Sequence, residues 1–380
     1  MTVHPKELVP GLAGIPAAES SVSFIDGQAG ILEYRGYPIE SLAANSTFEE
    51  VAWLLLYGRL PTQGELDAFR RELSAHRRLP AELRAFLAAL PRGGHPMNAL
   101  QAALAALGMV SPRVAAPDPE QQDEAILRIL ASTGALIAGA ERCRSGQQPI
   151  DPDPALGTAG NFLYMLTGEK PDEVKERVLD VALILHADHT MNASTFAARV
   201  VASTEADPYT VCSSAVGALF GALHGGANER VLEQLEAIGS AASVEAFADD
   251  AIANKKRIMG FGHRVYKTKD PRATALQGLV RELFAKHGST PIYDTALALE
   301  EQVVSRLGAK GIHPNVDFFS GIVYAKLGIP TDLFTPVFAL ARVAGYLAHW
   351  REQMADNKLF RPTQVYVGTH GKKYVGIEDR

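Results

Sequence analysis

Residues 125–140 read AILRILASTGALIAGA, sixteen positions with one charged side chain, Arg128. Apolar and small residues occupy almost every position, so a helix formed by this stretch has no face suited to water. Such a helix is stable inside a large assembly of other helices. The stretch therefore predicts a helix buried within a large helical bundle.

Helical signals continue on both sides of this stretch. The pairs Ser46–Glu49 and Thr62–Glu65 have the spacing of a capping box, which marks a helix start. In 81–90 the large apolar residues fall on one helical face. Two loops rich in Pro and Gly, 111–123 and 145–157, interrupt the pattern. Further helices are expected at about 171–185, 191–203, 208–223, 227–238, 272–287, 292–307, 317–327 and 335–354.

Strand signals are confined to the two ends of the chain. Residues 23–37 alternate around the turn dipeptide Asp26-Gly27, and residues 363–377 alternate around His370-Gly371. We find no internal repeat and no alternation of strands with helices. The expected fold class is therefore all-α, with minor β-hairpins at the termini.

Composition limits the class of protein. A chain of 380 residues with 47% hydrophobic and 21% charged residues is typical of a globular protein with two domains. A net charge of -6 argues against a nucleic-acid binder. Two cysteines without metal-finger spacing, and an N-terminus without a signal-peptide core, favour a cytoplasmic location. No apolar run reaches the roughly 18 residues of a membrane span.

Three histidines stand in unusual contexts. His186 and His189 are three residues apart, the spacing of one helical face, so they are either a metal-ligand pair or helix-packing residues. His224 is expected to end a helix just before the Gly225-Gly226 break. It is either an imidazole placed in a cleft or a plain helix C-cap.

The stretch GFGHRVYKTKDPRA at 260–273 concentrates charge around a broken backbone. Gly260 and Gly262 permit close approach of a ligand, and His263 follows. The neighbouring cations Arg264, Lys267, Lys269 and Arg272 suit phosphate or carboxylate groups. The alternative is a solvated basic loop.

Two further charged groups lie among apolar residues. Asp317 precedes Phe318-Phe319 near an expected helix start, and it is either a general base with a tuned pKa or an N-cap. Arg342 interrupts an otherwise apolar helix face, where a buried guanidinium needs an anionic partner. Together, these residues suggest chemistry on a small polycarboxylate.

The motifs HADHTMNASTF, HGGANE, GFGHRVYKTKDPRA, HPNVDFFSG and RPTQVYVG, in this order, resemble the citrate synthase family, in its shorter bacterial and archaeal type. The resemblance begins near Gly11 and covers nearly the whole chain. It implies a large helical domain, 1–225 with 329–380, and a smaller helical domain, 226–328, that binds coenzyme A and closes over the active site. It also implies a homodimer.

The resemblance assigns roles to single residues. His224, His263 and Asp317 match the family's catalytic residues. His189, Arg272, Arg342 and Arg361 match its oxaloacetate ligands, with Arg361 reaching in from the other subunit. The expected coenzyme A contacts are Arg257, Ile258, Gly260, Phe261, Gly262, Lys267, Lys310 and Asn315. Some family members have Arg where this chain has Lys267.

The activity implied by the resemblance is condensation of acetyl-CoA with oxaloacetate, followed by hydrolysis of citryl-CoA to citrate and CoA. The expectation includes no metal and no other cofactor. One alternative is a 2-methylcitrate synthase that uses propionyl-CoA, because one extra methylene is worth only about 1–3 kcal/mol of discrimination. More remote alternatives are a metal-dependent lyase built on His186, His189 and His224, and a non-catalytic helical scaffold.

Overall fold

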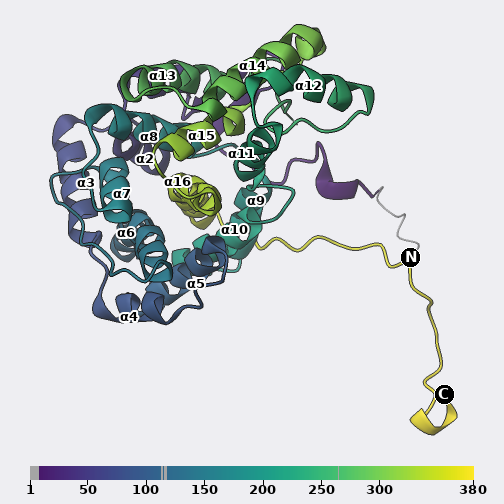
Figure 1. Cartoon of the computed structure of the whole chain (residues 1–380). Helices are drawn as coiled ribbons and strands as arrows, with labels where there is room; N and C mark the ends of the chain where they lie inside the picture. The colour runs from purple at the N-terminus through teal and green to yellow at the C-terminus, as the bar shows by residue number, and fades with distance from the viewer. Residues whose placement is uncertain (1–7, 113, 115–117, 264) are drawn as a thin grey trace.

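The computed structural model describes residues 8–112, 114, 118–263 and 265–380, so Arg264 lies outside the described residues. The described chain is mostly helical (Figure 1). Its first helices are α1 (Ile39–Asn45), α2 (Phe48–Tyr57), α3 (Gln63–His76), α4 (Ala81–Ala89), α5 (Pro96–Met109), α6 (Pro119–Arg144), α7 (Thr158–Thr167) and α8 (Glu173–His186). The remaining helices are α9 (Ala193–Ala202), α10 (Pro208–Leu219), α11 (Ala227–Ile238), α12 (Val244–Ala253), α13 (Pro271–His287), α14 (Pro291–Leu307), α15 (Val316–Lys326) and α16 (Phe334–Ala355).

Two long helices form the centre of the molecule. Residues 129–139 of α6 are all buried, which confirms the helix expected from 125–140. Helix α16 is buried from Phe334 to Trp350 on every side, and Figure 1 shows it with other helices all around it. It contacts α2, α6, α8, α9 and α10, so residues far apart in sequence share one core around α16.

The N-terminal hairpin is confirmed. Strand β1 (Ser23–Asp26) pairs antiparallel with β2 (Ile31–Tyr34), and β2 pairs with the short β3 (Tyr37–Pro38). Tyr34 is fully buried, and its hydroxyl donates to the carbonyl of Asp188 at 2.8 Å. The sheet is therefore tied to the loop that follows α8.

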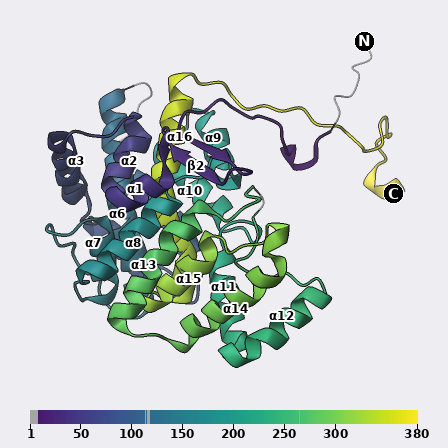
Figure 2. The same cartoon turned by 90° about the horizontal axis from the view of Figure 1, so that it is seen from above.

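The C-terminal hairpin expected at 363–377 is wrong. Residues 361–376 form no strand, and 361–375 lie exposed along a tail that leaves the helical body (Figures 1 and 2). An isolated two-stranded hairpin is at best marginally stable in water, and among the described residues this segment packs into no sheet.

The helices expected from 171 onwards are confirmed with small shifts in their ends, except that 208–223 ends earlier, at Leu219. The capping box of Thr62 and Glu65 is confirmed, whereas Thr47 instead of Ser46 caps α2. Helices α1, α5, α7 and α12 were not foreseen. Helices α1, α7 and α12 have no side-chain cap of their own, and α7 is capped from a distance, because Thr158 N donates to Glu49 of α2 at 2.6 Å.

Helices α11, α12, α14 and α15 contact one another through α11–α15, α11–α14 and α12–α14 pairs. The division into domains 1–225 with 329–380 and 226–328 stays a prediction. Cys143 and Cys212 are free thiols. Among the described residues, no helix is long and apolar enough to cross a membrane.

We predict that Gly345→Ala destabilises the protein by about 1–3 kcal/mol, because the added methyl group would overpack α16 against its neighbours. A Cβ at Gly345 would strike the carbonyl of Ala187 and lie 2.6 Å from the carboxylate of Asp188. The matched control is Gly278→Ala in α13, where a Cβ meets no atom within 4 Å. That change should stabilise by about 0.5–1 kcal/mol. Urea unfolding measures both, and equal effects would contradict the packing account.

Candidate active site

Two motifs far apart in sequence meet through their backbones. Phe261 forms an antiparallel bridge with Pro314, Gly262 N donates to His313 O at 2.9 Å, and Asn315 N donates to Gly260 O at 2.9 Å. Gly260 has a φ of 80°, and a Cβ there would lie 2.9 Å from Phe318. Glycine is therefore required at Gly260, and the pairing places His263 and Asp317 just beyond the two paired segments.

His263 is held by backbone donors. The amides of Val265 and Tyr266 donate to its Nδ1 at 3.0 and 3.2 Å. Burial, then the charge of Arg272, lowers the pKa of His263 to about 4. The neutral ring therefore carries its proton on Nε2, which is free to donate to a ligand oxygen.

His224 lies in the turn between α10 and α11, five residues past Leu219, so the expectation that it ends a helix is wrong. Its Nε2 lies 2.8 Å from the hydroxyl of Ser194 and accepts from the Ser194 amide at 3.3 Å. The hydroxyl of Tyr346 donates to the same serine at 2.7 Å. Burial lowers the pKa of His224 to about 4, so the neutral ring presents Nδ1–H.

His186 and His189 do not share a helical face, because α8 ends at His186. The Nδ1 of His186 lies 2.7 Å from the carbonyl of Ala182 one turn earlier. His189 follows in a loop, with its Nε2 3.3 Å from the hydroxyl of Tyr266. Burial, Arg272 and His263 hold the pKa of His189 well below its ordinary value. Within the described ranges, no three His, Cys, Asp or Glu side chains are grouped to hold a metal ion.

Arg272 forms a buried ion pair that the sequence analysis missed. Its Nη2 and Nε donate to Asp270 at 2.8 and 3.1 Å, and both side chains are at most 5% exposed. Asp270 is also the N-cap of α13, a signal that an Asp-Pro pair at a helix start carries. The carboxylate fixes one edge of the guanidinium and leaves Nη1 for another acceptor.

Arg342 is 1% exposed in α16, as its place among apolar residues predicted. Its Nε donates to the carbonyl of His186 at 2.7 Å, and its guanidinium carbon lies 4.7 Å from the centre of the Phe338 ring. No carboxylate of the described residues lies within ion-pair distance of this side chain. A buried cation without such a partner creates a strong preference for an anion from outside.

Asp317 is the second residue of α15, and Asn315 caps the helix by accepting from the Asp317 amide at 3.0 Å. The N-cap alternative for Asp317 is therefore wrong. Burial raises the pKa of Asp317 to about 6, although Arg272 and Arg342 act in the opposite direction. A half-buried carboxylate that titrates near neutral pH is what a general base needs.

The expected coenzyme A contacts lie along the paired segments. Ile258 and Phe261 are buried, and the side-chain Nδ2 of Asn315 donates to Gly262 O at 3.0 Å. The expected cationic contacts are exposed: Arg257, Lys267 and Lys310. The Lys267 carbonyl lies 2.6 Å from where Gly311 would carry a Cβ, so the segments of Lys267 and Lys310 are neighbours. Arg361 is exposed on the C-terminal tail.

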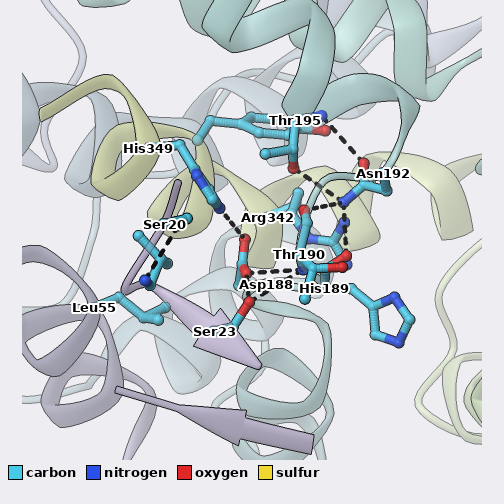
Figure 3. A network of polar contacts seen from close by, with 12 residues as sticks. Ser20, Ser23, Leu55, Asp188, His189, Thr190, Asn192, Thr195, Arg342 and His349 are labelled. Atoms are coloured by element: carbon cyan, nitrogen blue, oxygen red, sulfur yellow. Dashed lines mark hydrogen bonds and ion pairs between the residues drawn. The ribbon is translucent and has the colours of Figure 1, made fainter. Parts of the chain in front are cut away.

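A buried polar network supports the loop of His189. Figure 3 shows Ser23, Asp188, Thr190 and His349 meeting on one side of this loop, while the His189 ring points away from them. Asp188 is fully buried, with its Oδ1 3.3 Å from Nε2 of His349. Sequence reasoning found His189 but missed Asp188, Ser194 and Tyr266, because tertiary contacts alone give these residues their importance.

A separate cavity of about 440 Å³ lies between α2, α3, α7 and α8. None of the histidines, arginines or coenzyme A contacts described in this subsection lines it, and neither does Asp317. Two of its carboxylates serve as helix caps: Glu49 accepts from Thr158 N, and Asp180 accepts from Phe48 N at 3.0 Å. We therefore place the candidate site at the histidines, Asp317 and the buried arginines.

Comparison with known proteins gives one consistent result. The family model described as "Citrate synthase, C-terminal domain" matches residues 11–363. The chain is 55% identical to a citrate synthase of Synechocystis sp., over 97% of this chain and 93% of that protein. It is 50% identical to a citrate synthase of Acidithiobacillus ferridurans, over 98% of each.

Solved structures agree. The crystal structure of citrate synthase from Pyrobaculum aerophilum matches with a TM-score of 0.93 and 40% identity, over 98% of this chain and 95% of that one. Citrate synthase from Thermoplasma acidophilum, in a ternary complex with carboxymethyl coenzyme A and oxaloacetate, matches with a TM-score of 0.91 and 36% identity. That match covers 98% of this chain and 100% of the other.

We predict that Asp317→Asn makes the folded state more stable above pH 6. Because the folded pKa of about 6 exceeds the ordinary 3.8, wild type loses stability as pH rises from about 4 through 6. The advantage of the variant should therefore be present at pH 8 and absent near pH 4. Urea unfolding at the two pH values measures it.

The control for this prediction has the opposite sign. Arg59 and Thr62 lower the pKa of Glu65 to about 2, so its ionised form stabilises the fold above its ordinary value of 4.5. Glu65→Gln should therefore lose stability at pH 8. An Asp317→Asn variant that is less stable than wild type at pH 8 would contradict the raised pKa of the Asp317 carboxyl group.

Proposed function

The chain belongs to the citrate synthase family, and we propose that His224, His263 and Asp317 carry out its condensation reaction. Its activity is that of a citrate synthase, an acyltransferase that converts the acyl group to alkyl on transfer. Acetyl-CoA and oxaloacetate are the substrates. The observation that carries the division of roles is a carboxylate with a raised pKa, Asp317, beside two buried guanidinium groups.

The first step is removal of a proton from the acetyl methyl group. This carbon acid is very weak, so a carboxylate alone cannot form the enolate. Asp317 takes the proton, and its raised pKa makes it a better base than an ordinary aspartate. His224 donates Nδ1–H to the thioester oxygen and stabilises the negative charge that develops there. Ser194 and Tyr346 fix the ring for this task.

The second step joins the enolate carbon to the ketone carbon of oxaloacetate. With oxaloacetate bound, His263 takes up a proton from solvent, faces the ketone oxygen with Nε2–H, delivers a proton to that oxygen as the bond forms, and returns to its neutral form. Arg272 lowers the pKa of His263, and a substrate carboxylate on Arg272 offsets that charge, so oxaloacetate itself helps His263 to gain a proton. His189 and Arg342 hold the rest of the dianion, with Arg272 providing a planar fork.

Water then hydrolyses the citryl thioester and releases CoA. We propose that closure of the domain 226–328 delays water until condensation is complete, because an early attack would waste acetyl-CoA. The chemistry divides into proton transfers and charge stabilisation by side chains already present. We propose that it requires no metal ion and no other cofactor.

Coenzyme A would lie along 257–262 and 313–315, with Lys267 and Lys310 near its phosphates. The charge of Arg257 also lowers the pKa of Asp317, which supports a position of Arg257 near the end of the site where the acyl group reacts. We further propose a cytoplasmic homodimer that acts in the tricarboxylic acid cycle. In it, Arg361 on the exposed tail completes the partner's site.

We expect thiol release from acetyl-CoA only in the presence of oxaloacetate, and slower release from propionyl-CoA by kcat/KM. Asp317→Asn and His263→Ala should each lose at least about a hundredfold in kcat, because a positioned proton donor or acceptor contributes that much. A clear preference for propionyl-CoA would instead favour the 2-methylcitrate reaction. Full activity of both variants would remove the proposed roles.

The shared site predicts complementation between two inactive variants. Arg361→Ala and His263→Ala should each be inactive as homodimers. When the two chains are produced together, a mixed dimer has one site with both native residues, so half of its sites should work. Activity that does not rise above that of the two separate homodimers would show that Arg361 acts within its own chain or not at all.

A further inference from the structure

Thr190, directly after His189, has an unusual backbone conformation. Its φ is 50°, in the left-handed region that a β-branched residue rarely adopts. In an isolated chain, a threonine here would return to an ordinary conformation and turn the preceding residue with it. Something around the loop must therefore hold Thr190 in place.

Two side chains hold the strained residue. The amide of Thr190 donates to Oδ2 of Asp188 at 3.1 Å and to Oγ of Ser23 at 3.1 Å. Ser23 in turn donates its hydroxyl to the same carboxylate oxygen. The N-terminal hairpin and Asp188 thus close the turn from one side (Figure 3).

Asp188 is itself held by neighbours from two other elements, β2 and α16. His349 of α16 lies 3.3 Å from its Oδ1, and the Tyr34 hydroxyl donates to its carbonyl and accepts from its amide at 3.1 Å. Gly345 lets α16 approach the carboxylate closely. A side chain held this firmly can resist the tendency of Thr190 to relax.

The same turn also leads to the second histidine. Asn192 caps α9, and its side-chain amide donates to the carbonyls of His189 and Thr190, both at 3.3 Å. Ser194, on the first turn of α9, contacts His224. A change in Thr190 therefore affects His189 directly and His224 through one helix start.

We propose that Asp188 is a positioning residue, which holds Thr190 in the left-handed conformation and so directs His189 toward oxaloacetate. The inference rests on the proposed function, since it concerns how one of its oxaloacetate ligands is placed. Asp188 and Thr190 touch neither substrate in this account. Their effect reaches the reaction only through the orientation of His189.

The alternative is that Asp188 stabilises the fold alone, as one member of a buried ion pair. The two accounts differ for glycine at position 190. Glycine adopts a positive φ without strain, so Thr190→Gly removes the need for the Asp188 acceptor. A purely stabilising Asp188 gains nothing in substrate binding from this second change.

The experiment compares wild type, Asp188→Ala, Thr190→Gly and the double variant. Oxaloacetate affinity is measured by calorimetry without acyl-CoA, and both KM values are measured by thiol release. We expect Asp188→Ala to weaken oxaloacetate binding about tenfold or more, with the KM for acetyl-CoA within about twofold of wild type. Thr190→Gly alone should bind normally, and in the double variant it should restore most of the lost affinity.

Glu352→Gln is the matched control. Glu352 belongs to the same network through Arg199 and Ser21 but does not contact Thr190. It should lower the unfolding midpoint and leave oxaloacetate affinity unchanged. If Asp188→Ala does not fold, Ser23→Ala and Ser23→Ala/Thr190→Gly replace it. We then expect a smaller loss of oxaloacetate affinity, which Thr190→Gly should again restore.

Unchanged affinity in Asp188→Ala, or in Ser23→Ala where it is used, overturns the inference. So does a loss that Thr190→Gly fails to reduce. These results leave the proposed function intact as long as wild type binds oxaloacetate and releases thiol. If wild type does neither, the proposed function fails, and the inference fails with it.

Discussion

The site depends on two buried guanidinium groups, those of Arg272 and Arg342. Both act on the same neighbours, His189 and Asp317. A buried cation is costly unless an anion compensates it. Arg272 is partly compensated by Asp270, whereas Arg342 donates to a backbone carbonyl and packs on Phe338. The remaining positive charge favours an anionic ligand and acts on the pKa values of His189, His263 and Asp317.

The arginines and burial act together on the histidines. Both lower the histidine pKa values, so His189, His224 and His263 stay neutral and serve as hydrogen-bond donors. On Asp317 the two effects oppose each other: burial raises its pKa and the arginines lower it, with a result near 6. The site can therefore hold a base and neutral donors at the same pH, which proton removal from a weak carbon acid requires.

The sequence was sufficient for the helical class, the buried helix α6 and the N-terminal hairpin. It also indicated the proposed site residues, whose roles stay predictions. Motifs such as GFGHR carry these residues as local patterns. The sequence was insufficient where a residue on another element caps a helix, orients a side chain or neutralises a charge. Glu49 caps α7 from another helix, Ser194 orients His224 from α9, and Asp270 neutralises part of Arg272. The hairpin predicted at 363–377 was wrong for a different reason: an alternating pattern predicts a strand only where a sheet or a core is available to pack against it.

The proposed mechanism requires that His224 and His263 are neutral in the free enzyme, with tautomers fixed by their hydrogen bonds. Nitrogen-15 NMR of the imidazole rings reports both properties, with His224→Gln and His263→Gln used to identify the signals. At pH 7 without oxaloacetate, we expect a neutral His224 protonated on Nδ1 and a neutral His263 protonated on Nε2, both titrating only near pH 4. An imidazolium signal from either residue at pH 7, or a proton on the opposite nitrogen, would contradict it.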